Sequence, residues 1–310
     1  MSRTILVTGA TGQQGRALVD ALFSSHSSQP PFKVLALTRN TQSPSAAAIA
    51  AKYPKVSLLR GDLDDCNAIF DSAKEPIWGV FSVQVFAGGN ATLESEEKQG
   101  NALIDASIAH GVKHFVYASV DRGGDRSEDD PTPVPHFASK YRVEQYLKKK
   151  TTANDDSQKP SDMTWTILRP VAFMENLKPG FMTKAMITSL KITRARTLRI
   201  HLISCADIGW FAAEAFRKPE EYRNKAFSLA GDSLDLNELD QVFVEKTGHK
   251  APSTFNFVAR GFFYWLPEFG KMFKWLGENP YTIDVEGLRK IHPGLMTLGT
   301  WMEQNGYAKK

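Results

Sequence analysis

The stretch TILVTGATGQQGRALVDAL, residues 4–22, decides the fold class of this chain. It opens with Ile5-Leu6-Val7, an apolar run typical of a short buried strand, and it closes with apolar residues at helical spacing. Three glycines, Gly9, Gly12 and Gly15, lie between the two patterns. A strand, a glycine-rich turn and a helix in this order are typical of the first unit of a dinucleotide-binding domain.

Each glycine of this turn has a separate physical role. Gly9 allows the tight turn off the strand, Gly12 leaves room for a diphosphate, and Gly15 lets the helix pack closely on the sheet. The helix that follows offers free N–H groups and a positive dipole to phosphate oxygens. The spacing is GxxGxxG without a following Lys-Ser or Lys-Thr pair, which excludes a triphosphate-binding loop. The alternative is a glycine-rich turn without a ligand.

The end of the second predicted strand, residues 34–37, indicates which dinucleotide binds. An NAD site needs an acid about 20 residues beyond the loop for the ribose 2′-hydroxyl. Here Arg39 follows the strand and no acid stands beside it. A guanidinium suits a 2′-phosphate, so Arg39 favours NADP, unless it is only an exposed charge. Asp62 and Leu63, after the third strand, are placed to meet the adenine edge, or Asp62 instead caps the next helix.

The rest of the chain continues the alternation of apolar strands and helices. It predicts a Rossmann-type α/β fold with a doubly wound parallel sheet and a smaller, mostly helical C-terminal lobe. Residues 1–170 and 205–230 are expected to form the NAD(P)-binding domain, and residues 171–204 and 231–310 the smaller substrate or partner lobe. The further strands are expected at residues 56–59, 79–83, 114–119, 165–168 and 226–229, and the longest helices at residues 93–110 and 136–149.

Two segments depart from this alternation. Residues 120–135 are rich in Asp, Arg, Gly and Pro, and we expect an exposed loop there. Residues 256–276 are rich in Phe and Trp, which indicates the core of the smaller lobe or, alternatively, a groove lined by aromatic rings.

Composition excludes several classes of function. The chain has 310 residues and a formal net charge of +4, which is too small to argue for direct nucleic-acid binding. The basic run Lys148–Lys150 is expected to end a helix. Cys66 and Cys205 fit no zinc motif and indicate a cytoplasmic or nuclear setting, and no signal peptide, membrane span or metal cluster is expected.

Seven motifs together carry a resemblance to a known family. They are VTGATGQQG (7–15), LTRN (37–40), GDLDD (61–65), EEKQGNALIDA (96–106), HFASKYRVEQYL (136–147), LRPVAFMENL (168–177) and LMTLGTWMEQNG (295–306). With these motifs the chain resembles the NmrA-like family of atypical short-chain dehydrogenases over nearly its whole length. That family includes NADP-sensing regulators with little or no catalysis, and it borders on reductases.

The resemblance implies an NADP site along the carboxyl ends of the strands. It implies that the glycine loop holds the diphosphate and that Arg39 holds the 2′-phosphate. Lys98 and Lys140 are implied at the nicotinamide half, although each is otherwise a long side chain on a helix face. The loop residues are Gly9, Ala10, Thr11, Gly12, Gln13 and Gln14; Gln84, Val85 and Phe86 are implied along the adenine-ribose path, and Val171, Phe173, Glu175 and Asn176 near the nicotinamide.

The catalytic residues of a short-chain dehydrogenase are only partly present. Such enzymes use Tyr-x-x-x-Lys with an upstream Ser, where the Lys lowers the Tyr pKa and holds the nicotinamide ribose. Lys140 and Ser119 are in place, but His136 stands where the Tyr is expected. Either catalysis is lost, or another group replaces the Tyr: His136, whose ordinary pKa is near neutral, Lys140 itself, or Tyr141. His136 is otherwise a plain residue at a helix start.

Two functions follow from this departure. We favour an NADPH/NADP redox sensor that regulates through a protein partner and has little or no dehydrogenase activity. The alternative is an NADPH-dependent reductase of a small hydrophobic or aromatic substrate, and a structural interaction module is a third interpretation. We expect a monomer or homodimer without a nucleic-acid or membrane partner.

Overall fold

The computed structural model describes residues 2–24, 32–85, 92–152, 161–192, 199–257, 261, 264, 267–280 and 282–307. The chain divides into two compact units, which are described separately. Unit 1 comprises Met1–Ser119, Ser139–Arg169 and Ile208–Phe227, and unit 2 comprises Val120–Ala138, Pro170–Asp207 and Ser228–Lys310.

Unit 1 is built on a seven-stranded sheet with the order β3-β2-β1-β4-β5-β6-β9. The pairings described from β3 to β6 are all parallel, and the chain winds outward from β1 in both directions, so the predicted doubly wound fold is confirmed. The elements are β1 (Thr4–Val7), α1 (Gln13–Leu22), β2 (Lys33–Thr38), α2 (Pro44–Lys52), β3 (Val56–Arg60), α3 (Cys66–Asp71), β4 (Gly79–Ser82), α4 (Leu93–Ala109), β5 (His114–Ala118), α5 (Pro135–Thr151, which begins in unit 2), β6 (Thr164–Pro170), α7 (Cys205–Arg217), α8 (Pro219–Tyr222) and β9 (Lys225–Leu229).

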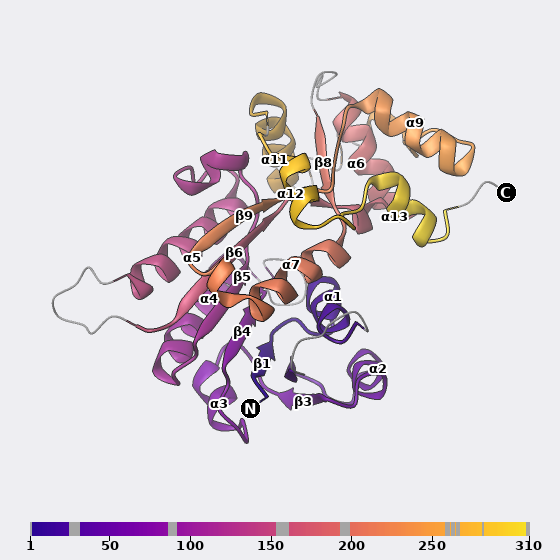
Figure 1. Ribbon diagram of the computed structural model, residues 1–310. Helices are drawn as coiled ribbons and strands as arrows, with labels where there is room; N and C mark the ends of the chain where they lie inside the picture. The colour runs from indigo at the N-terminus through magenta and orange to yellow at the C-terminus, as the bar shows by residue number, and fades with distance from the viewer. Residues whose placement is uncertain are drawn as a thin grey trace. The chain divides into compact units, whose positions relative to one another are not determined.

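Helices cover both faces of the unit 1 sheet (Figure 1). On one face, α3, α4 and α5 bury Ile69, Leu103 and Leu147 in one apolar cluster with the strands. On the other face, α7 packs so closely that a Cβ on Gly79 of β4 would lie 2.9 Å from the Phe216 ring. Strands covered on both faces explain why their sequences are almost continuously apolar.

Helices α1 and α7 meet backbone to backbone. A Cβ on Gly209 of α7 would lie 2.4 Å from the carbonyl carbon of Ala17 in α1, closer than real Cβ atoms approach other atoms. Gly209 is therefore the residue that permits this contact.

Local sequence signals at helix ends behave as expected. The Ser43 side chain accepts a hydrogen bond from the Ala46 backbone N–H at the start of α2, with Pro44 in the first turn. Helix α5 ends in the basic run Lys148–Lys150. The helix end that the sequence predicts at Lys148–Lys150 is confirmed.

Unit 2 contains a small sheet that the sequence analysis did not predict. Its strand order is β10-β8-β7, with β8 parallel to β7 and antiparallel to β10. Strands of two to four residues are too short to show a periodic pattern. The elements of unit 2 are η1 (Gly124–Glu128), β7 (Ala172–Phe173), η2 (Met174–Leu177), α6 (Phe181–Ile192), β8 (Ile200–Ile203), β10 (Asp232–Leu234), α9 (Leu236–Thr247), α11 (Pro267–Glu278), α12 (Val285–Ile291) and α13 (Leu298–Gln304).

Carboxylates fix the C-terminal segment within unit 2. The buried Asp207 accepts a hydrogen bond from the Met296 N–H at 3.2 Å, and Asp232 accepts one from the Leu298 N–H at 2.8 Å. Trp301 of α13 is buried in the apolar cluster of this unit. Helix α13 is therefore part of the core of unit 2.

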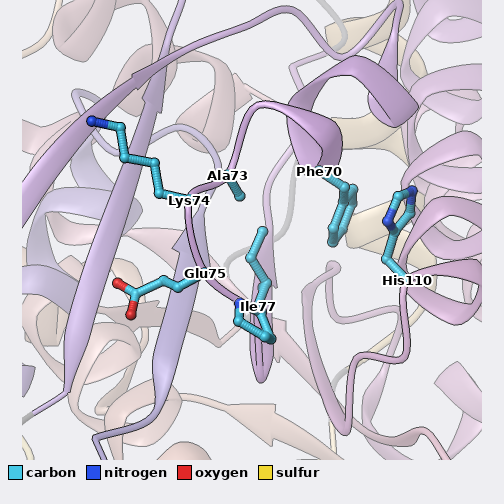
Figure 2. Close-up of a pocket in the computed structure, with 7 residues that line it drawn as sticks. Phe70, Ala73, Lys74, Glu75, Ile77 and His110 are labelled. Carbon is cyan, nitrogen blue, oxygen red and sulfur yellow. The ribbon is translucent and has the colours of Figure 1, made fainter.

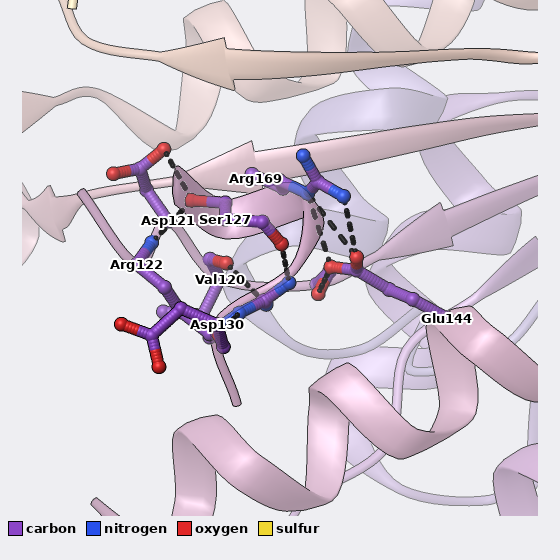
Figure 3. A network of polar contacts seen from close by, with 8 residues as sticks. Val120, Asp121, Arg122, Ser127, Asp130, Glu144 and Arg169 are labelled. Atoms are coloured by element: carbon purple, nitrogen blue, oxygen red, sulfur yellow. Dashed lines mark hydrogen bonds and ion pairs between the residues drawn. The ribbon is translucent and has the colours of Figure 1, made fainter. Parts of the chain in front are cut away.

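The expectation of an exposed loop at residues 120–135 is only partly right. Asp125, Arg126 and Glu128 are exposed, but they belong to the short helix η1, and the start of the segment is buried. Asp121 and Arg122 are both fully buried. Asp121 accepts hydrogen bonds from the N–H groups of the two following glycines, and the Arg122 guanidinium donates to the carbonyl oxygens of Ser127 and Asp130 (Figure 3). These charges are buried because the loop itself supplies their partners.

The aromatic segment 256–276 is only partly core. Phe273 and Trp275 are buried as predicted, whereas Phe257 is 72% exposed. Three further aromatic residues of this segment, Phe262, Phe263 and Trp265, lie outside the described residues.

No described helix combines the length and the apolar character that crossing a bilayer requires.

Candidate functional site

The carboxyl ends of the parallel strands of unit 1 form one edge of its sheet, called here the carboxyl edge. The glycine loop follows β1, Arg39 follows β2, Asp62 follows β3, and Gln84 follows β4. Strands β2 and β4 flank β1, and the chain winds away from β1 on both sides. In open sheets of this kind, ligands bind in the crevice at that switch point.

The glycine loop has the geometry that its sequence predicts. Gly9 has a φ of +58°, in the left-handed region that favours glycine. A Cβ on Gly15 would lie 2.3 Å from the Gly9 carbonyl oxygen, so this position accepts no side chain. Helix α1 begins after Gly12 with no side-chain cap and no acidic residue in its first turn. The positive end of the α1 dipole is thus not compensated by a carboxylate of its own first turn.

Polar atoms beside the loop also fit a ligand. Thr8 ties the end of β1 to that of β4, because its hydroxyl accepts a hydrogen bond from the Val83 N–H at 2.7 Å. The buried Gln84 donates to the Ser82 hydroxyl at 2.8 Å. Its Oε1 atom and the Oε1 atom of Gln14 are buried, and neither has a hydrogen-bond partner in the part of the chain that is described. Buried polar atoms without partners are typical of ligand sites.

Arg39 and Asp62 differ in what they contact. Arg39 is exposed, and its guanidinium makes no hydrogen bond or ion pair with another described residue. The alternative that Asp62 caps the next helix is wrong, because Asp65 accepts the Ala68 N–H at the start of α3. Asp62 instead accepts the Asp64 N–H at 3.2 Å, while Leu63 is partly buried.

Lys140 of α5 places its ammonium at the end of β5, in an ion pair that the sequence did not suggest. Its Nζ is 2.9 Å from Oε1 of Glu96 in α4 and 3.4 Å from the Ala118 carbonyl oxygen. Glu96 is fully buried, and its Oε2 accepts the Ser139 hydroxyl at 2.5 Å. Buried carboxylates are stable only when they are paired and hydrogen-bonded, as this one is.

Ser119, the predicted catalytic serine, is part of a second buried network in unit 1. Its hydroxyl donates to the carboxylate of Glu144 in α5. The Arg169 guanidinium of β6 contacts the same carboxylate, with Nη2 to Oε2 at 2.6 Å and Nε at 3.2 Å from both oxygens (Figure 3). Glu144 is fully buried and Arg169 nearly so. The serine proton therefore already has an acceptor inside the protein.

Unit 2 holds the remaining predicted residues near the nicotinamide. Glu175 is hydrogen-bonded within this unit. Its Oε1 accepts the Cys205 N–H at 3.0 Å and lies 3.3 Å from the Trp301 indole nitrogen. Burial and the nearby Glu175 carboxylate raise the pKa of the Cys205 thiol, so this cysteine stays protonated. Val171 is buried, Phe173 is partly buried, and Asn176 is exposed.

His136, at the start of α5, is also in unit 2 and is 7% exposed. Its Nδ1 lies 3.9 Å from Oε2 of Glu268, and its ring packs edge-on against Phe137.

The other predicted contacts are solvent-facing. Lys98 is exposed, and no described residue forms a hydrogen bond or ion pair with it. Val85 is 62% exposed, an unusual state for an apolar residue. Phe86 lies outside the described residues.

A pocket of about 230 Å³ in unit 1 is separate from this edge. It lies beside the loop that leads into β4, at the amino end of that strand. The Phe70 and His110 rings stack at 4.9 Å, while Lys74 and Glu75 point away from them (Figure 2). The lining residues are Phe70, Ala73, Lys74, Glu75, Pro76, Ile77 and His110. A dinucleotide along the carboxyl ends of the strands does not reach this pocket.

Sequence reasoning missed the two buried carboxylates, Glu96 and Glu144. A signal was present for Glu96, because it shares a helix face with Gly100, Leu103 and Ser107, all of which are buried. A carboxylate within a stripe of small and apolar residues indicates an internal partner rather than solvent.

These features define a Rossmann-type fold with a glycine-rich turn at the switch point of its sheet. The chain belongs to the NmrA-like family, whose profile matches residues 1–296. An NmrA-like oxidoreductase of Aspergillus sp. (strain MF297-2), notA, is 34% identical over 268 residues, 80% of this chain and 74% of that protein. An NmrA-like family domain-containing protein of Dictyostelium discoideum is 23% identical over 263 residues, 82% of this chain and 81% of that protein.

Solved structures share the fold at low sequence identity. NmrA, a negative transcriptional regulator determined in complex with NADP, superposes with a TM-score of 0.72 at 18% identity, covering 98% of both chains. The triphenylmethane reductase of Citrobacter sp., complexed with NADP(H), gives 0.71 at 17% identity, covering 97% of this chain and 99% of that one. The same fold therefore occurs in a regulator and in a reductase that bind NADP.

Proposed function

We propose that this chain binds NADP at the carboxyl edge of unit 1 and reports the NADPH/NADP⁺ state to a protein partner, with little or no dehydrogenase activity. The glycine loop and the α1 N-terminus hold the diphosphate, and Arg39 holds the 2′-phosphate. Bound NADP supplies a nicotinamide ring that exists in two redox forms. The lobe boundaries predicted from sequence and the cytoplasmic or nuclear setting remain part of this proposal.

The hydrogen bond from Ser119 to Glu144 carries the choice of a sensor over an enzyme. A reductase needs a proton donor within hydrogen-bond reach of the substrate oxygen. The Ser119 proton is directed into the protein, and Lys140 is paired with Glu96. The Tyr that usually donates is replaced by His136. The regulator NmrA, whose solved structure holds NADP, supports the same choice.

Titration calorimetry tests the binding step. We expect wild-type protein to bind NADP⁺ more tightly than NAD⁺, and Gly15→Val to bind neither, because its side chain would fill the turn. Gly277→Ala is the matched control, since a Cβ there meets nothing within 4 Å. Capture of a partner protein only in the presence of NADP tests the second step. Equal binding of NADP⁺ and NAD⁺ by wild-type protein contradicts the proposal.

The second candidate is an NADPH-dependent reductase of a small hydrophobic or aromatic substrate. The named oxidoreductase among the relatives favours it, and so does the triphenylmethane reductase fold. In that case His136 supplies the proton. NADPH consumption over a panel of aromatic substrates, lost in His136→Asn, supports the reductase and contradicts the sensor.

A further inference from the structure

We propose that Glu96 sets the relative affinity for NADP⁺ and NADPH by neutralising the charge of Lys140. This inference rests on the proposed function, since it concerns the nicotinamide end of the same site. It assigns a role in redox discrimination to a residue that contacts no ligand directly and acts through Lys140.

The position of the pair supports this role. The Lys140 ammonium lies 3.4 Å from the carbonyl oxygen of Ala118, the last residue of β5, and therefore at the carboxyl edge. Its side chain is 12% exposed, whereas that of Glu96 is 0% exposed. The ammonium thus lies at the end of β5, paired with a carboxylate that is closed to solvent, and the Ser139 hydroxyl holds the other carboxylate oxygen at 2.5 Å.

The charge difference between the two ligands supplies the physical reason. The nicotinamide ring of NADP⁺ carries a positive charge, and the ring of NADPH does not. An unpaired ammonium at this edge repels only the oxidised ring, and repulsion is strong where water is excluded. Among the described residues, Glu96 is the carboxylate that forms an ion pair with Lys140. The neighbouring buried cation, Arg169, is neutralised in the same way by Glu144. Each buried pair is neutral as a whole, so neither the Lys140 ammonium nor the Arg169 guanidinium is left to repel the oxidised ring.

Calorimetric titration with NADP⁺, NADPH and adenosine 2′,5′-bisphosphate tests the inference. In Glu96→Gln we expect the ratio of Kd for NADP⁺ to Kd for NADPH to rise about tenfold. The bisphosphate lacks nicotinamide, and its Kd should stay within about threefold of wild type, which also shows that the variant is folded. The matched control is Glu97→Gln, one residue further along α4, where a partly exposed carboxylate pairs with Arg142 at 2.7 Å. Its ratio should equal that of wild type.

Lys140→Met provides an independent arm if Glu96→Gln does not fold. It removes the ammonium and leaves the carboxylate, so the ratio should fall below the wild-type value. A lysine that only holds the ribose predicts instead that both forms weaken equally. An unchanged ratio in either variant overturns the inference while the proposed function stands. Failure of wild-type protein to bind either dinucleotide overturns both.

Discussion

The two ends of the carboxyl edge are built on opposite principles. At β1 and β2, helix α1 begins without a side-chain cap and Arg39 is exposed. At β5 and β6, Lys140 and Arg169 each lie against a fully buried carboxylate. Arg39, proposed to bind an anionic ligand, is exposed, whereas Ser119 and Lys140, the predicted catalytic residues, already interact with buried carboxylates. This contrast supports the proposal of a binding protein with reduced catalysis.

The largest effect on stability is expected at the β5–β6 end of the carboxyl edge. Glu144→Ala leaves the buried Arg169 charge without its carboxylate, which should lower the free energy of unfolding by about 3–5 kcal/mol. Urea unfolding measures this loss. The partly exposed Glu97 is the control, and Glu97→Ala should cost less than about 1 kcal/mol. Equal losses in the two variants would show that the Glu144–Arg169 pair is not closed to solvent.

Acid should also lower the free energy of unfolding, through His114 of β5. Burial lowers the pKa of His114 from 6.5 to about 4, helped by the charge of Arg3. Below pH 6.5 the unfolded chain takes up a proton that the folded chain refuses, so stability is full above pH 6.5 and is lost as the pH falls towards 4. The total loss should be about 3 kcal/mol. In His114→Gln the free energy of unfolding should fall less steeply over this range, and an identical slope contradicts the assignment.

At the β1–β2 end of the carboxyl edge, a substitution should change the affinity for NADP⁺ rather than the stability of the fold. Arg39→Ala removes charged hydrogen bonds to the 2′-phosphate, so NADP⁺ should bind about 30-fold more weakly, a change of about 2 kcal/mol. Binding of NAD⁺ should change by less than about threefold, and unfolding should not change. Arg223→Ala, which removes an exposed arginine paired with Glu220, is the control. Parallel weakening of both dinucleotides would remove Arg39 from the site.

The smallest effect separates the two candidate functions. Ser119→Ala removes one donor to Glu144 and should lower stability by about 1 kcal/mol. The Kd for NADP⁺ should stay within about threefold, because the serine hydroxyl points into the protein. Loss of a measurable NADPH-dependent reduction in this variant would instead make Ser119 a catalytic residue.

The sequence predicted the larger sheet well because its signals are local. Apolar strands, the caps at Ser43 and the glycine turn depend on neighbours in the chain. The same holds for the part of the candidate site at β1 and β2, where the turn geometry at Gly9 and Gly15 and the position of Arg39 after β2 depend on the local sequence. Such features need no knowledge of which distant residue lies opposite.

Features that depend on distant partners were not predicted. Glu96 pairs with a residue of another helix, and Glu144 with one of a following strand. The buried Asp121 and Arg122 were interpreted as exposed for the same reason, since a charged residue shows no sign of its partner in composition or periodicity. The partners of Lys140 and Ser119, on which the proposed choice between sensing and catalysis rests, could be identified only from the structure.

The contact of Gly209 with Ala17 has a consequence for the entropy cost of ligand binding. Helix α7 clamps α1 through the main chain, at a point with no side chain that can rearrange. Helix α1 is therefore held in place whether or not a ligand is bound. If NADP binds as proposed, association loses little conformational entropy at this helix, and selection between cofactors depends on the charges around the crevice rather than on the shape of a closing loop.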